Sequence, residues 1–152
     1  MSWIKNRINI KLRRIEKTDF PKLVELFREF ATFQKKPEKV TNTEEQMLQE
    51  SDYVNGFVAL QNDEVIGYVT CFFAYYTWIG KSLYMDDLYV KPQFRAQGVG
   101  TKLINQVIEF GKAQNCKKLH WQVSEWNQPA IDFYKSIGAS VDGVESNCDL
   151  QL

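Results

Sequence analysis

An apolar segment, a loop with two glycines and a helical pattern follow one another in the chain, and this order constrains the fold most. Residues 82–90 (SLYMDDLYV) predict a strand that is nearly all apolar except for Asp86 and Asp87. Residues 91–100 (KPQFRAQGVG) hold the glycines, and apolar residues recur beyond them at helical spacing. This arrangement favours anion binding, because the first N–H groups of a helix lack partners and the helix dipole is positive there.

The remaining pattern predicts one mixed α/β domain that spans residues 1–152. No repeat or Pro/Gly-rich linker divides the chain. Further strands are expected at 8–15, 56–60, 64–75 and 118–123, with one or two short strands after Gly138. Helices are expected after an N-cap at Thr18 or Asp19, from about Thr43, and over 127–137, and a turn is expected at Asn62 and Asp63.

Charge and cysteine content exclude several classes of function. The chain has 19 Lys and Arg against 19 Asp and Glu, so no general basic field is available for nucleic acid or an anionic membrane. No apolar run is long enough to cross a bilayer. The three cysteines form no C-x-x-C pair and His120 is the only histidine, so a disulfide framework and a zinc site are not expected. We therefore expect a cytoplasmic protein without a metal.

Three types of glycine loop were compared with residues 95–101 (RAQGVGT). The dinucleotide fingerprint requires a third glycine where Leu103 stands. The phosphate-binding P-loop requires Lys before Ser or Thr, and here Thr101 precedes Lys102. The third type, R/Q-x-x-G-x-G/A, binds pyrophosphate in acetyl-CoA-dependent N-acetyltransferases and fits at every position.

Four blocks in register carry a resemblance to one family. They are Trp78-Ile79-Gly80-Lys81 with the following acid pair, the glycine loop, Glu125-Trp126-Asn127 and Phe133-Tyr134-Lys135. The chain resembles the GNAT superfamily of N-acetyltransferases, and within it the diamine (spermidine/spermine) branch most. The likeness is close over 75–140 and holds only in outline over the first 50 residues. It implies a single-domain α/β (α+β) fold, with a mixed, mostly antiparallel, twisted sheet and helices on both sides.

The resemblance also implies how acetyl-CoA is held. The strand end Leu88-Tyr89-Val90 would pair with the pantetheine arm, and the N–H near Leu88 would donate to the thioester carbonyl. The opposite side of the arm would meet Asn127, Pro129 and Ala130. The pyrophosphate would be wrapped by Ala96, Gln97, Gly98, Val99, Gly100 and Thr101. Arg95, which precedes these residues, is either a phosphate partner or a solvated cation.

For catalysis, the resemblance assigns Tyr134 as the acid toward the leaving thiolate and Asp86 as the proton acceptor, directly or through water. Residues expected near the acceptor amine are Asp86, Asp87, Trp78 and Glu125. Strand alternation is expected to send the two aspartates to opposite faces, so one of them is alternatively a structural acid. Trp78 is alternatively a core or dimer aromatic, and His120 is interpreted as a framework residue.

Three positions depart from the polyamine enzymes. Those enzymes have acids where this chain has Gln34, Tyr76 and Ser146, which disfavours spermidine as the acceptor. The prediction is an N-acetyltransferase that moves the acetyl group of acetyl-CoA to a primary amine in a ternary complex. Small amines, polyamines, lysine-like amino acids and protein lysines remain open as acceptors, and a homodimer is expected. The alternative is a non-catalytic acyl-CoA sensor on the same fold.

Overall fold

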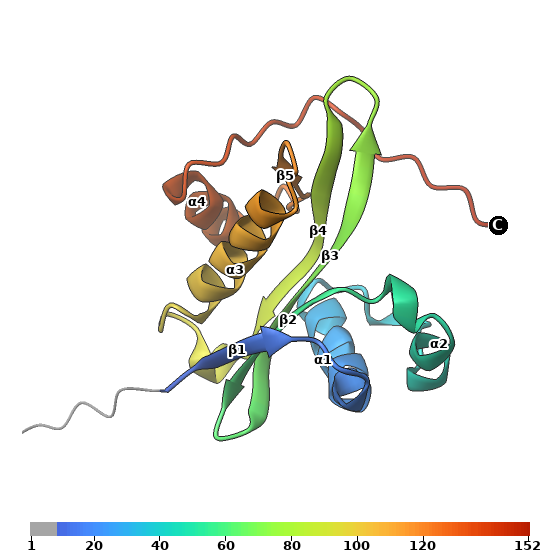
Figure 1. Ribbon diagram of the computed structural model, residues 1–152, viewed down its shortest axis with the longest axis vertical. Coiled ribbons are helices and arrows are strands. Elements are labelled where there is room, and N and C mark those ends of the chain that lie inside the picture. The colour runs from blue at the N-terminus through green and yellow to red at the C-terminus, as the bar shows by residue number, and fades with distance from the viewer. Residues whose placement is uncertain (1–8) are drawn as a thin grey trace, which may run out of the picture. The chain divides into compact units, whose positions relative to one another are not determined.

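A computed structural model describes residues 9–152, in which five strands form one sheet in chain order (Figure 1). The strands are β1 (Lys11–Arg14), β2 (Gly56–Gln61), β3 (Glu64–Tyr76), β4 (Gly80–Val90) and β5 (Leu119–His120). The first four pair antiparallel with their neighbours, whereas β5 runs parallel to β4. The predicted mixed, mostly antiparallel sheet is confirmed. Residue 8 of the strand expected at 8–15 lies outside the described residues.

The α-helices are α1 (Phe20–Phe33), α2 (Glu44–Gln49), α3 (Val99–Ala113) and α4 (Gln128–Ser136). Short 3₁₀ turns lie at Lys17–Asp19, Pro37–Lys39, Ser51–Tyr53 and Pro92–Phe94. The chain divides into two compact units, residues 1–120 and 121–152. The first contains the sheet with α1, α2 and α3, and the second contains α4.

The starts of α1 and α2 differ in how they are capped. The helix expected from about Thr43 is α2, and Thr43 is its N-cap, since its Oγ1 accepts a hydrogen bond from the Gln46 N–H at 3.1 Å. Asp19 precedes α1 but forms no side-chain cap. Its carboxylate instead binds the Arg13 guanidinium in two places, at 2.7 and 2.8 Å. A two-pronged ion pair at a buried carboxylate is stronger than a neutral cap, and it links α1 to β1.

Turn predictions were more accurate than predictions for the C-terminal region. Asn62 and Asp63 join β2 to β3 with φ values of 49° and 62°, the left-handed pair that suits a tight hairpin. Gly138 follows α4 with φ of 95°. The strand expected at 118–123 is only two residues long. The strands expected after Gly138 are wrong, because residues 139–152 contain no helix or strand and their valines are exposed.

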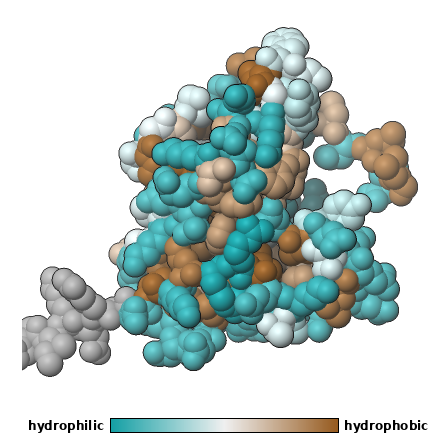
Figure 2. Space-filling view, in the orientation of Figure 1, coloured by the Kyte–Doolittle hydropathy of each residue, from teal (hydrophilic) through white to brown (hydrophobic). Residues whose placement is uncertain are grey.

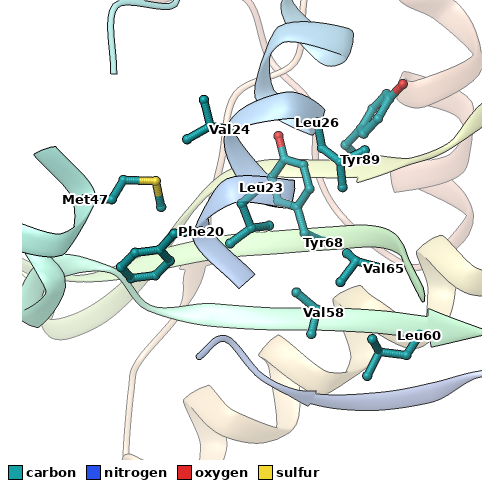
Figure 3. Packing of buried hydrophobic residues seen from close by; sticks show 10 residues of the cluster. All are labelled: Phe20, Leu23, Val24, Leu26, Met47, Val58, Leu60, Val65, Tyr68 and Tyr89. Carbon is teal, nitrogen blue, oxygen red and sulfur yellow. The ribbon is translucent and has the colours of Figure 1, made fainter. Parts of the chain in front are cut away.

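A helix packs against each face of the sheet, α1 on one and α3 on the other (Figure 1). On one face, α1 and α2 pack against β2, β3 and β4 in a cluster of apolar side chains (Figure 3). Its buried members are Phe20, Leu23, Val24, Leu26, Met47, Val58, Leu60, Val65, Tyr68 and Tyr89. On the other face α3 packs, and its Phe110 ring meets Phe57 of β2 at 5.8 Å. Phe57 and Val58 therefore point to opposite faces, as the period of a strand requires. Helices on both sides of the sheet are confirmed.

Candidate active site

A β-bulge in β4 determines where the two aspartates point. In the pairing of β3 with β4, Thr70 lies opposite Asp87 and Cys71 lies opposite Met85. Asp86 is therefore an extra residue without a partner in the register. An extra residue on one strand reverses the alternation of side chains along that strand.

The residues on either side of the bulge show the result of this reversal. After it, Asp87 lies on the α1 face, because its Oδ2 accepts a hydrogen bond from the buried Tyr68 hydroxyl at 3.0 Å. Before it, Leu83 faces α3, since a Cβ built on Gly111 of that helix would lie 3.1 Å from the Leu83 side chain. Tyr84 must then face α1, and so must Asp86 two residues later. The expectation that the aspartates occupy opposite faces is wrong.

Burial and mutual repulsion make this acid pair unusual. Burial, together with the charge of Asp86, raises the pKa of Asp87 to about 6, and the hydrogen bond from Tyr68 opposes that rise. Asp86 is exposed, but partial loss of solvent around its carboxylate also raises its pKa. Two neighbouring carboxylates that repel each other gain from a cation placed between or beside them. The pair is therefore suited to receive an ammonium group.

The free edge of β4 lies beside the acid pair. The Lys91 N–H donates to the Ile66 carbonyl of β3 at 2.9 Å. Because N–H groups alternate along a strand, those of Leu88 and Val90 point away from β3.

On that outer side, β5 pairs with β4 only at Leu83 and Tyr84. From the bulge to Val90, no strand of the described residues pairs with this edge. An extended ligand can therefore add to the sheet there as another strand would.

The loop after β4 presents backbone donors. Ala96 and Gly98 have φ values of 60° and 79°, and Gly98 is the N-cap of α3. The Lys102 N–H donates to the Gly98 carbonyl at 3.0 Å, so the N–H groups of residues 99–101 precede the first bond of the helix. No side chain caps this terminus. The resembled family commonly has glycine at position 96, which agrees with the left-handed backbone there.

Arg95 is oriented toward α1. Its Nε donates to the Val90 carbonyl at 3.0 Å, and its guanidinium lies 5.0 Å from the Phe33 ring and 5.6 Å from the Tyr89 ring. A hollow of about 610 Å³ lies beside it, lined by residues of α1, the end of β4 and the following turn. The Arg95 side chain is thus engaged with β4 and α1, and the backbone N–H groups of residues 99–101 are the donors that could meet an anion at this loop.

The second unit holds Glu125, Asn127, Pro129 and Tyr134. Asn127 caps α4 through its side chain, which accepts a hydrogen bond from the Ala130 N–H at 3.4 Å. Pro129 occupies the first turn of this helix, where the missing N–H is not needed. The Tyr134 ring meets that of Trp121 edge to face at 5.1 Å. Glu125 lies in the turn before α4.

The comparisons with known proteins agree with this geometry. The Acetyltransferase (GNAT) family matches residues 20–139. The chain is 33% identical over 142 residues to a thialysine N-epsilon-acetyltransferase of Bos taurus, covering 86% of this chain and 84% of that protein. The chain belongs to the GNAT acetyltransferase family. The predicted family and N-acetyltransferase activity are thereby confirmed.

Solved structures support the fold of this acetyltransferase. An aminoglycoside acetyltransferase from an uncultured soil metagenomic sample, in complex with trehalose, is 23% identical with a TM-score of 0.78. That likeness covers 94% of this chain and 96% of the other. An aminoglycoside N-acetyltransferase in complex with CoA is 18% identical with a TM-score of 0.69, covering 92% and 96% of the two chains.

The other residues of the acetyltransferase that were named from its sequence lie on several different segments of the chain. Trp78 lies at the tip of the β3–β4 hairpin and is 98% exposed, so the interpretation of it as a core residue is wrong. This tip is drawn mostly in pale colours of intermediate hydropathy in Figure 2. Gln34 follows α1, Tyr76 ends β3 and Ser146 lies in the segment after α4.

Two residues near the acid pair were missed or undervalued. Tyr68 was only one apolar position of a predicted strand, yet its hydroxyl binds Asp87. His120 was interpreted as a framework residue, but it is exposed and its ring meets those of Tyr76 and Tyr84. No local signal in the sequence marks these contacts, because each joins different strands.

Within residues 9–152, no three His, Cys, Asp or Glu side chains gather closely enough to hold a metal ion. None of the helices in the same residues has the length and apolar character needed to cross a membrane.

Proposed function

We propose that this acetyltransferase transfers the acetyl group of acetyl-CoA to a primary amine, with Asp86 accepting the proton of the amine. The observation that supports this most is the bulge in β4. It sets two carboxylates on one face of the strand, next to the edge on which the Leu88 N–H points outward.

The residues present fit acetyl-CoA. The outer edge of Leu88, Tyr89 and Val90 can pair with the amides of the pantetheine arm. The backbone of residues 96–101 can bind the pyrophosphate, because the first N–H groups of α3 lie there. The assignment of Asn127, Pro129 and Ala130 to the same arm rests on the family resemblance. Acetyl-CoA, when bound, supplies an acetyl group activated as a thioester.

The acid pair addresses the main barrier of the reaction. A lysine-like amine has a pKa near 10.4, so removing its proton at neutral pH costs about 4–5 kcal/mol. Asp87 attracts the ammonium, and Asp86 accepts its proton directly or through water. The amine nitrogen then forms the new C–N bond as the C–S bond breaks, while the Leu88 N–H donates to the carbonyl oxygen. Tyr134 gives its hydroxyl proton to the departing thiolate, and the second proton that the nitrogen loses as the amide forms restores the tyrosine through solvent.

The acceptor is proposed to be a short amine rather than a long polycation. The similar Bos taurus protein is a thialysine acetyltransferase by name, and thialysine carries its reacting amine on a flexible stem. At Gln34, Tyr76 and Ser146 this chain lacks the acids expected of a polyamine enzyme. A second and third ammonium would therefore find few carboxylate partners.

Two further proposals concern the whole molecule. We infer a homodimer from the family resemblance, and the exposed aromatic side chains at the tip of the β3–β4 hairpin support it. We infer a cytoplasmic location from the three unpaired cysteines, of which Cys71 is buried.

The test measures CoA-thiol release near pH 8 with thialysine, lysine, putrescine and spermidine as acceptors. We expect Asp86→Asn to lower kcat by about 100-fold or more, the usual scale for a general base. Tyr134→Phe should lower kcat more than it weakens acetyl-CoA binding. The control is Asp149→Asn, at an exposed aspartate of the C-terminal segment, which should leave kcat unchanged.

Two outcomes would contradict the proposal in different ways. Unchanged kcat in Asp86→Asn would remove that residue from catalysis. Tight acetyl-CoA binding without turnover of any amine would favour the sensor alternative.

A further inference from the structure

We propose that Lys118 and a strip of four aromatic rings bind the non-reacting end of the acceptor, and that this end carries a carboxylate. The rings of this aromatic strip are Phe72, Tyr76, Tyr84 and His120. The proposal rests on the proposed function, since it takes the amine end of the acceptor to lie at Asp86.

The aromatic strip is continuous across three strands. Phe72 of β3 stacks on Tyr84 of β4, with ring centroids 4.9 Å apart and planes inclined by 18°. Tyr84 meets His120 of β5 at 5.5 Å, and His120 meets Tyr76 at the end of β3 at 6.0 Å. Each ring thus contacts the next, and together they form one apolar surface.

The aromatic strip shares a face of the sheet with the acid pair. Phe73, the neighbour of Phe72, meets Phe110 of α3 at 5.8 Å, so Phe72 points to the opposite side. Tyr84 lies two residues before Asp86 on β4, and the charge of Asp86 contributes to raising the pKa of Tyr84. The strip therefore leads directly to the carboxylates. Phe72 remains 45% exposed, so a ligand can reach it.

A cation lies at the far end of the aromatic strip. The Lys118 Nζ lies 4.5 Å from the centroid of the Tyr76 ring. Because Leu119 pairs with Leu83, Lys118 is level with Ser82, four residues before Asp86. At roughly 3.3 Å per residue, the positions of Lys118 and Asp86 are about 13 Å apart along the strand. The face is thus negative at one end, aromatic in the middle and positive at the other.

This order of charges matches an acceptor with an ammonium at one end and a carboxylate at the other. In an extended lysine-like amino acid, these groups are roughly 7 Å apart, from ordinary bond lengths. To reach this carboxylate, the Lys118 ammonium would leave the Tyr76 ring, which belongs to the residue paired with Gly80, and turn toward Asp86. Its flexible four-carbon stem can span the remaining distance of roughly 6 Å. The stem of the acceptor would lie across the rings. A diamine of the same length would instead bring a second ammonium against Lys118, where like charges repel.

Neighbouring lysines do not share this position. Lys81 lies on the α3 side, since its Nζ is 4.9 Å from the Phe73 ring and donates to the Gln114 carbonyl. Lys117 is exposed and, by alternation, points away from the side that Lys118 occupies. Lys117 therefore offers a matched control, with the same charge one residue away.

The experiment compares thialysine with its decarboxylated counterpart, the same diamine without the carboxylate. We expect the wild type to show kcat/KM at least tenfold higher for thialysine. Lys118→Gln should lose most of this preference through a higher KM for thialysine, with kcat/KM for the diamine unchanged or higher. Lys118→Glu should reverse the preference, whereas Lys117→Gln should keep it. Thermal unfolding of each variant shows that it is folded.

The outcomes separate the inference from the function on which it rests. Equal wild-type activity on both acceptors would overturn the inference alone, as would an equal loss for both in Lys118→Gln. The inference would also be overturned if Lys117→Gln had as large an effect as Lys118→Gln. The preference would then depend on positive charge in this region and not on the position of Lys118. Absence of turnover with both acceptors would overturn the proposed function, and the inference with it.

Discussion

The two halves of the β3–β4 hairpin carry aromatic rings on the same face and use them differently. Next to α1, Tyr68 and Tyr89 are 0% and 4% exposed and meet the α1 residues Phe27 and Phe30, each pair at 5.2 Å. Beyond the bulge, Phe72 has the same orientation as Tyr68 but remains 45% exposed. The covered half buries its rings under a helix, whereas the open half leaves them accessible, where we propose that the acceptor binds.

Within one pair of strands, the covered half therefore contributes to stability, whereas the open half is the part that we propose binds the acceptor. Burying a large aromatic side chain stabilises a fold by about 2–3 kcal/mol, and the covered half gains this from α1. The acids Asp86 and Asp87 lie where the two halves meet. The packed half therefore holds them in place, while they face the open half. A site that must be both rigid and accessible requires such an arrangement.

The largest expected effect tests the comparison with one substitution in the α1 helix that covers one half and one substitution in the open half. Phe20→Ala, in the α1 cluster at 2% exposure, should lower the free energy of unfolding by about 3–5 kcal/mol, because it leaves a cavity. Phe72→Ala should cost about 1 kcal/mol or less, since solvent already reaches that ring. Urea unfolding of both variants measures the difference. Similar losses would show that the open half is structural core after all.

Local patterns in the sequence predicted most elements of the fold. Alternation, caps and turn residues mark β2, β3, α2 and the Asn62-Asp63 turn, and each of these depends on neighbours in the sequence. The glycine loop was found for the same reason. Its fit to a pyrophosphate-binding pattern depends on residue types at fixed spacing.

Contacts between distant strands explain what the sequence did not show. Whether Asp86 and Asp87 share a face depends on which β3 residues lie opposite, because the bulge exists only in the pairing of the two strands. The aromatic strip likewise joins residues 72 and 120 through neighbours on three strands. Asp19 was expected as a cap, but the Arg13 guanidinium competes for the same carboxylate.

A smaller effect, on the pH dependence of kcat/KM, is expected at Asp87, which lies where the two halves of the hairpin meet. Asp87 has a pKa of about 6, so kcat/KM for the acceptor should rise with pH as Asp87 ionises and attracts the ammonium. The hydrogen bond from Tyr68 lowers this pKa. Tyr68→Phe should therefore move the acidic limb of the pH profile to higher pH and reduce kcat/KM near pH 6 by a few-fold, the value of one such bond.

The control for this shift is Tyr53→Phe, at an exposed tyrosine outside the site, which should leave the acidic limb in place. Asp87→Asn should remove the contribution of Asp87 and leave an acidic limb that reports the ionisation of Asp86 alone. An unmoved limb in Tyr68→Phe would contradict the role of the hydrogen bond. Equal changes in kcat/KM at all pH values would indicate a structural effect only.

The smallest expected effect lies at the hairpin tip, furthest along the open half. Trp78→Ala should change the free energy of unfolding by about 0.5 kcal/mol or less in dilute protein, because a side chain that is 98% exposed loses almost no contacts. If two copies associate through this tip, the wild-type Tm will rise with protein concentration, and Trp78→Ala will abolish that dependence. A concentration-dependent Tm that survives the substitution would place the dimer contact elsewhere. The open half would then serve the acceptor alone.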